Sequence, residues 1–303
     1  MLDTIIIGSG PAGMAASIYA GRAGINAIVI EESPIDGGQV NSTYEVDNYP
    51  GLPGISGMEL SDKLSEHAKK AGLERIEAKV TGIECLPEDS GYKVITDAGE
   101  YESKTVVLAT GARHALLNVP GEEELSGMGV SYCATCDGAF FKNLDVCVVG
   151  GSDVAVEDAI YLSKICRKVT LIHRRDTFRA AQSLVDAMEK CDNIEYELNS
   201  EVKEIRGEDE VTEVIVFNRM SGGTTILPVS GIFIAVGINP STELIKDLVS
   251  LSDNGYAIAG EDCRTDKKGI YVAGDIRKKP MRQIITAVAD GANAINSVLE
   301  DIQ

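Results

Sequence analysis

The chain has 303 residues, of which 44% are hydrophobic and 25% are charged, and its formal net charge is −19. This acidity argues against a phosphate backbone or an anionic membrane as a partner, so neither nucleic acid nor membrane binding is expected. No apolar run approaches the roughly 18 residues that cross a bilayer, and the length allows one large domain or two ordinary ones. The first ten residues, MLDTIIIGSG, predict a strand that enters a turn and not a signal peptide.

Residues 5–16, IIIGSGPAGMAA, join a short apolar run to a helical pattern through a glycine-rich turn. This order is typical of the loop that binds the pyrophosphate of a dinucleotide. Gly8 allows the tight turn, Gly10 lets backbone N–H groups approach the phosphates, and Gly13 lets helix and strand pack closely. The next predicted strand, NAIVIEES, contains Glu31 near its end, where a carboxylate accepts hydrogen bonds from a ribose diol.

A cysteine pair follows in the stretch CATCD, residues 133–137. The chain has seven scattered cysteines, which do not resemble a secreted disulfide framework, so we expect a reducing, cytoplasmic setting. Cys133 and Cys136 alone have a meaningful spacing, that of half a zinc site, a structural bridge or a dithiol that cycles. Zinc needs three or four ligands. Beyond this pair the chain has no second Cys-x-x-Cys and only three histidines, so no metal is expected. A permanent bridge does not suit a reducing compartment.

The glycine motif recurs at residues 147–158, CVVGGSDVAVED, again between an apolar strand and a helical pattern. The offset that carries Gly8 to Gly150 also places Ser152 and Ala155 on the second and third glycines. A lone motif of this kind is weak evidence, because a turn before a helix looks the same. Two copies with matched strands and helices predict a dinucleotide site in each half of the chain.

The two copies differ where the ribose is recognised. The position that corresponds to Glu31 is His173, and the stretch HRRDTFR adds Arg174, Arg175 and Arg179. A carboxylate repels a 2′-phosphate, whereas arginines bind one through charge-assisted hydrogen bonds. The first site therefore suits an adenosine with a free ribose, and the second suits NADP.

The order of elements predicts how the two folds share the chain. Residues 105–114 predict a strand that ends at Gly111, and residues 231–242 predict a similar strand that contains Gly237. A last strand, 269–276, and a last helix are most economically used to complete the first fold. The sequence thus predicts an α/β protein with two Rossmann-like domains. The domain over 116–243 is inserted into a discontinuous one over 1–115 and 244–303, with crossings near 112–118 and 240–246.

These motifs together resemble the low-molecular-weight, NADPH-dependent thioredoxin reductases of bacteria, and the resemblance runs essentially from end to end. The stretches that carry it are GSGPAG (8–13), GGQ (37–39), NYPG (48–51), ATGAR (109–113), CATCD (133–137), HRRDTFR (173–179), AVGINPST (235–242) and AGDI…RQ (273–283). The family's three-layer ββα domains are expected here, with FAD in the first domain and NADPH in the second.

The resemblance also implies positions along each cofactor. Gly38, Gln39 and Asn48 would lie along the flavin, Asp275 would hold its ribityl chain, and Arg282 and Gln283 would sit near its pyrimidine edge. The remaining FAD positions come from the first motif and from the strand ends: Gly8, Ser9, Gly10, Pro11, Ala12, Gly13, Glu31 and Gly111. The NADP positions are Gly150, Gly151, Ser152, Asp153, Ala155, His173, Arg174, Arg175, Arg179 and Gly237.

The implied activity is thioredoxin-disulfide reduction, with electrons passing from NADPH to FAD, to the Cys133–Cys136 disulfide and on to oxidised thioredoxin. In family terms Cys136 would face the flavin, Cys133 would attack thioredoxin, and Asp137 would shuttle protons. Because the dithiol and the NADP site share one domain, we expect that domain to rotate on its two crossings between half-reactions. The family also implies a homodimer.

The sequence departs from the family pattern at Ser152, usually glycine, and at Val154, usually serine. The Cβ of Ser152 could hold the phosphates off, or its hydroxyl could donate a hydrogen bond to them. Alternatives therefore stay open: a disulfide reductase with ferredoxin or NADH as donor, a reductase that serves a peroxiredoxin, or a flavin redox sensor without turnover. A peroxiredoxin reductase normally carries an N-terminal extension, for which no room is expected before Ile5.

Overall fold

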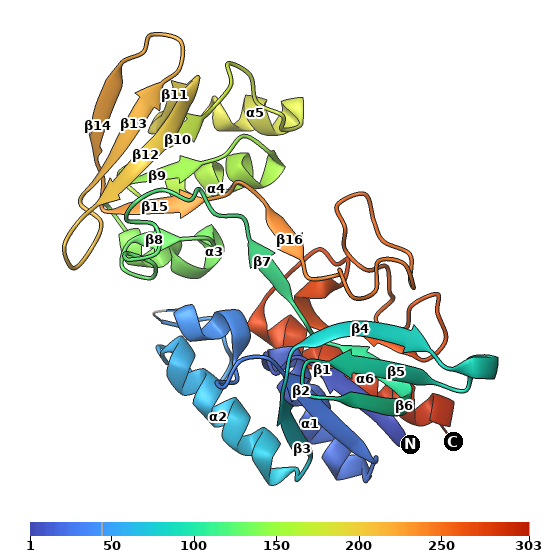
Figure 1. The fold of residues 1–303 in the computed structure, drawn as a ribbon. Coiled ribbons are helices and arrows are strands. Elements are labelled where there is room, and N and C mark those ends of the chain that lie inside the picture. The colour runs from blue at the N-terminus through green and yellow to red at the C-terminus, as the bar shows by residue number, and fades with distance from the viewer. Residues whose placement is uncertain (44, 303) are drawn as a thin grey trace. The chain divides into compact units, whose positions relative to one another are not determined.

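The computed structural model describes residues 1–43 and 45–302, apart from the side chains of residues 42 and 89. The chain divides into two units. The first comprises Met1–Thr43, Tyr49–Arg113 and Asn239–Gln303, and the second comprises His114–Ile238 with a short segment that ends at Asn48. Figure 1 shows the chain running from the first unit into the second and back. In chain order, the second unit thus lies between segments of the first.

The first unit is built on a sheet whose central strands are parallel. Its order is β3 (Glu74–Glu77), β2 (Ala27–Glu31), β1 (Leu2–Ile7) and β6 (Glu100–Leu108), and β17 (Ile270–Val272) pairs in parallel with β6. Two antiparallel strands, β5 (Tyr92–Thr96) and β4 (Val80–Cys85), extend the sheet beyond β6.

Alternate residues of β1 enter different hydrophobic cores, because successive side chains of a strand point to opposite faces. Ile5 and Ile7 pack in a core that includes residues of β4 and β5, whereas Ile6 packs among residues of α1 (Pro11–Ala23) and α6 (Ile284–Ile302). A further helix, α2 (Gly57–Lys70), begins with a capping box between Ser56 and Glu59. The first unit therefore has helices on one side of its central strands and the antiparallel strands β4 and β5 on the other.

The second unit repeats this plan. Its parallel sheet has the order β11 (Ile194–Leu198), β10 (Lys168–His173), β9 (Asp145–Val149), β15 (Gly231–Ile234) and β8 (Val130–Ser131). Alternate residues of β9 again enter two cores: one with α4 (Asp153–Ser163) and α5 (Gln182–Met188), the other with the antiparallel sheet. That sheet contains β12 (Ser200–Arg206), β13 (Glu213–Asn218) and β14 (Thr224–Pro228). The predicted α/β class with three-layer ββα packing is confirmed for both units.

The structure corrects the two predicted crossing strands. β6 ends at Leu108, and a separate strand, β7 (Ala112–His114), begins beyond Gly111, which has φ 67°. Likewise β15 ends at Ile234, and β16 (Ile238–Pro240) begins beyond Gly237, which has φ 141°. A positive φ suits glycine and interrupts a strand, so each glycine breaks what looked like one continuous apolar run. β7 and β16 form a two-stranded sheet of their own.

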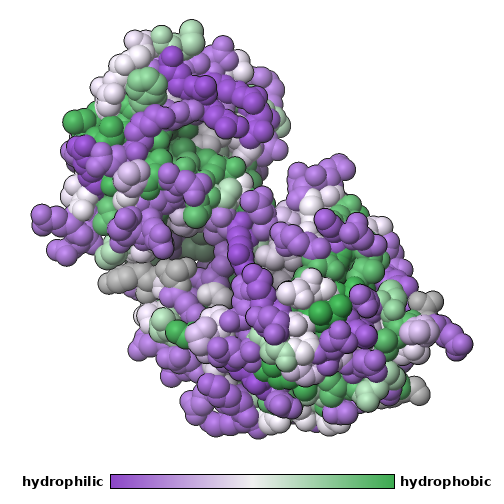
Figure 2. Space-filling view, viewed as in Figure 1, coloured by the Kyte–Doolittle hydropathy of each residue, from purple (hydrophilic) through white to green (hydrophobic). Residues whose placement is uncertain are grey.

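Polar side chains predominate on the visible face of each unit in Figure 2, in keeping with the high net charge. Within residues 1–43 and 45–302, no helix combines the length and the apolar character that crossing a bilayer requires.

The contact between α1 and α6 has no room for side chains at one point. A Cβ on Gly291 would lie 2.1 Å from the carbonyl oxygen of Ala12 and 2.9 Å from the nitrogen of Ala16. Both atoms belong to the backbone of α1, so the two helices can approach this closely only because residue 291 has no side chain. The approach fixes α1, and with it the glycine loop that precedes α1.

This packing gives the first prediction. In an open helix Gly→Ala stabilises by about 0.5–1 kcal/mol, but Gly291→Ala should lower the free energy of unfolding by about 1–3 kcal/mol because it overpacks the helix contact. Urea unfolding followed by circular dichroism measures the change. The control is Gly82→Ala in β4, whose Cβ would meet only ordinary contacts at 3.7 Å or more. Equal stability of the two variants would contradict the prediction.

Candidate functional site

The first glycine loop connects the end of β1 to the start of α1. A Cβ on Gly8, which has φ 103°, would lie 2.5 Å from the carbonyl oxygen of Ala109. A Cβ on Gly13 would lie 1.8 Å from the carbonyl oxygen of Gly8. Gly10 is different, because the nearest atom to its Cβ position is 4.0 Å away. Glycine at 8 and 13 is thus required by the protein's own backbone, whereas glycine at 10 leaves space at the helix N-terminus, where an anion binds favourably.

Glu31, at the end of β2, is tied to this loop. Its Oε2 accepts hydrogen bonds from the backbone N–H of Ser9 at 2.7 Å and from the Ser9 hydroxyl at 3.1 Å. Its Oε1 accepts from the N–H of Ser33 at 3.0 Å. The carboxylate is therefore fixed beside the glycine loop. Pro11, the first residue of α1, needs no hydrogen-bond partner for its nitrogen, and Ala12 behind it is buried.

The other predicted positions on the N-terminal side are placed as follows. Gly38 begins the short 3-10 helix η1 (Gly38–Ser42), and the side-chain amide of Gln39 donates to the carbonyl of Ala112. Gly111 accepts a hydrogen bond from the N–H of Ser241 at 3.0 Å. Asn48 is exposed and groups with the second unit.

Five buried side-chain polar atoms among the described residues of the first unit make no hydrogen bond in the structure; three of them belong to Thr4, Asn41 and Ser61. The other two are Oδ1 of Asp275, in the 3-10 turn η4 (Gly274–Ile276), and Nε of Arg282. The guanidinium of Arg282 lies 3.8 Å from the ring centroid of Tyr256. Burial raises the pKa of Asp275, while Lys279 and Arg282 oppose part of that rise. Buried polar atoms usually have partners, so these two indicate a polar ligand.

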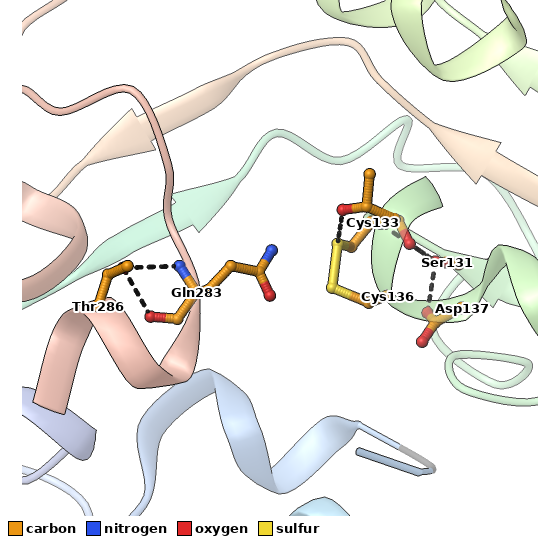
Figure 3. Close-up of a disulfide and its surroundings, with 7 residues drawn as sticks. Ser131, Cys133, Cys136, Asp137, Gln283 and Thr286 are labelled. Atoms are coloured by element: carbon orange, nitrogen blue, oxygen red, sulfur yellow. Dashed lines mark hydrogen bonds between the residues drawn. A yellow bond between two sulfur atoms is a disulfide. The ribbon is translucent and has the colours of Figure 1, made fainter. Parts of the chain in front are cut away.

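α6 begins directly after these residues. The backbone N–H of Gln283 donates to the Thr286 hydroxyl at 3.1 Å, and that hydroxyl donates to the carbonyl of Gln283 at 2.9 Å. These two contacts fix the start of the helix (Figure 3).

The second glycine loop, in the inserted unit, follows the same plan with different residues. A Cβ on Gly150 would lie 2.5 Å from the carbonyl oxygen of Ala235 and 2.6 Å from the Cβ of Ala155. Gly151 packs on the His173 ring, at 2.2 Å from its Cβ position. Ser152 has φ −92° and ψ 175°, an extended conformation open to any residue, and its side chain makes no capping hydrogen bond to α4. Serine therefore fits at this position without backbone strain.

The segment after β10 folds back onto this loop. The N–H of Arg179 donates to the carbonyl of Gly151 at 2.7 Å, and Asp153 Oδ1 accepts from the N–H of Ala181, also at 2.7 Å. His173 is buried and stacks on Phe178, and burial, together with the neighbouring arginines, lowers its pKa. Three further predicted residues are exposed in this segment: Arg174, Arg175 and Arg179.

Cys133 and Cys136 form a disulfide at the short helix α3 (Ala134–Asp137) (Figure 3). The hydroxyl of Ser131 donates to Asp137 Oδ2 at 2.6 Å and accepts from the Cys133 N–H at 3.1 Å. Burial raises the pKa of Asp137, and the hydrogen bond from Ser131 opposes that rise. The site thus places a disulfide beside a carboxyl group that keeps its proton to higher pH than an ordinary aspartate.

No group of three or more His, Cys, Asp or Glu side chains that could hold a metal occurs among the described residues.

The chain matches the pyridine nucleotide-disulphide oxidoreductase family over residues 2–291. It is 44% identical over 294 residues to a thioredoxin reductase of Listeria monocytogenes, covering 96% of this chain and 91% of that protein. It is 41% identical to a thioredoxin reductase of Bacillus subtilis, covering 99% of this chain and 96% of that protein. The chain belongs to the thioredoxin reductases.

Solved structures agree with this assignment. A thioredoxin reductase from Streptococcus pyogenes matches with a TM-score of 0.95 at 46% identity, covering 100% of this chain and 98% of that one. A Lactococcus lactis thioredoxin reductase, described as in the FR conformation, is 41% identical and matches 100% of this chain and 99% of that one, but its TM-score is 0.67. The two relatives thus differ from one another in overall arrangement although both match throughout.

Sequence reasoning missed two residues around the disulfide. Ser131 lies two positions before Cys133 and has no distinguishing pattern. Glu122 lies in the acidic run GEEEL, which is typical of a solvated surface, yet it is buried and accepts from two backbone N–H groups and from the Tyr132 hydroxyl at 3.0 Å. This glutamate therefore holds Tyr132, the residue directly before Cys133.

The second prediction concerns Ser131. Because its hydroxyl donates to the charged form of Asp137, Ser131→Ala should raise the pKa of Asp137 further. Infrared difference titration of carboxyl-labelled aspartate, with Asp137→Asn to identify the band, measures it. Thr135→Ala is the control, since Thr135 Oγ1 contacts Cys133 Sγ and not Asp137. An unchanged pKa in Ser131→Ala would refute the prediction.

Proposed function

We propose that this chain reduces the disulfide of thioredoxin with electrons from NADPH, through FAD and the Cys133–Cys136 pair. The observation that carries the proposal is the disulfide itself, which stands beside the half-buried Asp137 on the unit that also holds the second glycine loop. Membership of the thioredoxin reductases supports the same activity.

The residues of the first unit fit FAD. The unpartnered Asp275 and Arg282 atoms suit the hydroxyls and ring edge of a flavin nucleotide, Glu31 suits its ribose, and the open space at Gly10 suits a pyrophosphate. We assign FAD to residues 1–115 and 244–303. The positions that would hold it are Gly8, Ser9, Gly10, Pro11, Ala12, Gly13, Glu31, Gly38, Gln39, Asn48, Gly111, Asp275, Arg282 and Gln283.

The residues of the second unit fit NADPH, and we assign it to residues 116–243. The exposed arginines after β10 suit a 2′-phosphate, and Ser152 has an extended backbone and a hydroxyl not used in capping its helix. The positions that would hold NADPH are Gly150, Gly151, Ser152, Asp153, Ala155, His173, Arg174, Arg175, Arg179 and Gly237. When bound, the two cofactors supply the electron pair that reduces the protein's disulfide.

The chain's own residues carry the exchange with thioredoxin. In the reduced dithiol, the Cys133 thiolate attacks one sulfur of the thioredoxin disulfide, and the other thioredoxin sulfur leaves as a thiolate. Asp137, whose pKa is raised by burial, donates a proton to it. The Cys136 thiolate then attacks Cys133, which re-forms the Cys133–Cys136 disulfide and releases the second thioredoxin sulfur as a thiolate that takes its proton from solvent. Two electrons thus pass from the Cys133–Cys136 dithiol to the disulfide of thioredoxin. We assign Cys136 to the flavin side and Cys133 to thioredoxin.

This function gives the third prediction. Cys133→Ser and Cys136→Ser should abolish NADPH-dependent thioredoxin reduction, and Asp137→Asn should slow it about a hundredfold, the usual contribution of a general acid. A coupled insulin-reduction assay measures the rate, and the visible absorbance of the purified protein reports FAD content. Cys85→Ser, which removes an exposed free cysteine, is the control. Full activity in either active-site cysteine variant would overturn the proposal.

We further propose that the inserted unit rotates on β7 and β16 between half-reactions. Its support is that the dithiol and the assigned NADPH site lie on one unit, that the chain enters and leaves this unit by these two strands, and that solved relatives differ in overall arrangement.

The fourth prediction tests this rotation. A covalent cross-link between the two units should stop thioredoxin reduction while FAD stays bound, because one fixed arrangement cannot serve both half-reactions. The same linker attached within one unit is the control, and activity is measured before and after the linker is cleaved. Undiminished turnover in the cross-linked protein would exclude rotation.

We also propose that the protein is a homodimer in the cytoplasm. The resemblance to the family supports the dimer, and the free cysteines, with Cys147, Cys166 and Cys263 buried, suit a reducing compartment. Sedimentation of the FAD-loaded protein would show a monomer if the dimer proposal were wrong.

A further inference from the structure

A buried carboxylate, Asp290 of α6, organises the segment between η4 and α6 in the first unit. Its Oδ2 accepts hydrogen bonds from the backbone N–H of Gly274 at 3.0 Å and from Lys279 Nζ at 3.0 Å. The guanidinium of Arg277 donates to both oxygens, from Nη2 to Oδ1 at 2.8 Å and from Nε to Oδ2 at 3.2 Å. The side chains of Asp290, Arg277 and Lys279 are at most 5% exposed.

Lys279 stands between two carboxylates. Its Nζ is 3.0 Å from Asp290 Oδ2 and 3.8 Å from Asp275 Oδ1, and it also reaches the Thr286 hydroxyl at 3.3 Å. The longer distance to Asp275 is not a hydrogen bond, and this Oδ1 is the buried oxygen that lacks one. The ammonium is therefore committed to Asp290, although a second acceptor lies within reach of a small shift.

The remaining groups around Asp290 do not compete for Lys279. Arg277 also donates to the carbonyl of Gly260 at 3.1 Å, and its other acidic neighbour, Glu261, is 3.8 Å away and largely exposed. Arg282 stacks on Tyr256. The thiol of Cys263 donates to the backbone carbonyl of Asp290, not to its side chain.

We propose that Asp290 is a positioning residue for FAD binding: it holds Lys279 away from Asp275, so that the Asp275 carboxylate stays available to accept hydrogen bonds from FAD. The inference rests on the proposed FAD site and adds a residue that does not itself touch the cofactor. Two anions and two cations balance in this cluster. Without Asp290, a buried ammonium would have one carboxylate left nearby, and an uncompensated buried charge is costly enough to drive the pairing with Asp275.

Three variants of the full-length chain, freed of FAD, test the proposal. Asp290→Asn keeps an oxygen that can accept from the Gly274 N–H but removes the charge that holds Lys279. Asp290→Asn with Lys279→Met removes the competitor for Asp275 as well and restores the charge balance. Asp301→Asn is the matched control, because Asp301 lies on the same helix and accepts from Arg264 and from Tyr271.

Quenching of flavin fluorescence gives the Kd for FAD, and thermal unfolding of each apoprotein gives its stability separately. We expect Asp290→Asn to raise the Kd about ten- to a hundredfold, whereas Asp301→Asn changes it less than about threefold; tenfold corresponds to about 1.4 kcal/mol. The double variant should recover most of the lost affinity. A merely structural role for Asp290 predicts no recovery, since Lys279→Met removes a further buried contact.

Two results would overturn the inference alone: an Asp290→Asn variant that binds FAD as tightly as the unmodified chain, or a double variant that binds no better than Asp290→Asn. If the unmodified chain itself takes up no FAD, the proposed function fails and the inference fails with it. The binding measurement on the unmodified chain therefore separates the two failures.

Discussion

The first unit depends on backbone contacts that exist only where side chains are absent. The Cα of Gly13 lies against the carbonyl of Gly8, and that of Gly291 lies against the carbonyl of Ala12. The first contact sets α1 against the end of β1, and the second sets α6 against α1. Asp290 precedes Gly291 directly, so the same close approach places its carboxylate where the Gly274 N–H and Lys279 can reach it. The same close contact thus determines both how the helices pack and where the charged groups of the proposed FAD site lie.

The inserted unit reaches a similar loop with different residues, and the comparison separates what the fold requires from what a ligand requires. Gly150 is required by the fold, because Ala235 and Ala155 fill the space where its side chain would stand. Ala155 takes the place of the third glycine, and Ser152 takes that of the second without strain. The chain itself therefore does not require glycine at residue 152, just as it does not require it at Gly10 in the first unit.

The sequence was sufficient for the fold class and the repeated strand, glycine loop and helix, because glycine spacing and apolar runs directly record backbone constraints. It was misleading at residues 105–114 and 231–242, where glycines with positive φ split apolar runs that look continuous. It gave no sign of Ser131, Glu122 or Asp290, since their roles arise from partners remote in the chain or from unexpected burial. Asp290 is an example: a polar residue in a helix ordinarily faces solvent, and only the packing of Gly291 on α1 shows that this one cannot.

Two half-buried acids of the chain, Asp137 and Asp275, show how one physical effect has opposite consequences for their proposed roles. Burial raises the pKa of both Asp137 and Asp275. In the role proposed for Asp137 the rise is useful, because a proton donor must keep its proton until a thiolate leaves, and the hydrogen bond from Ser131 opposes the rise. In the role proposed for it, Asp275 instead accepts hydrogen bonds from FAD, for which the charged form is better. Lys279 opposes the effect of burial from 3.8 Å, near enough to favour the charge and too far to occupy the oxygen. On this argument, the position of one ammonium between two carboxylates decides whether Asp275 can hold a ligand.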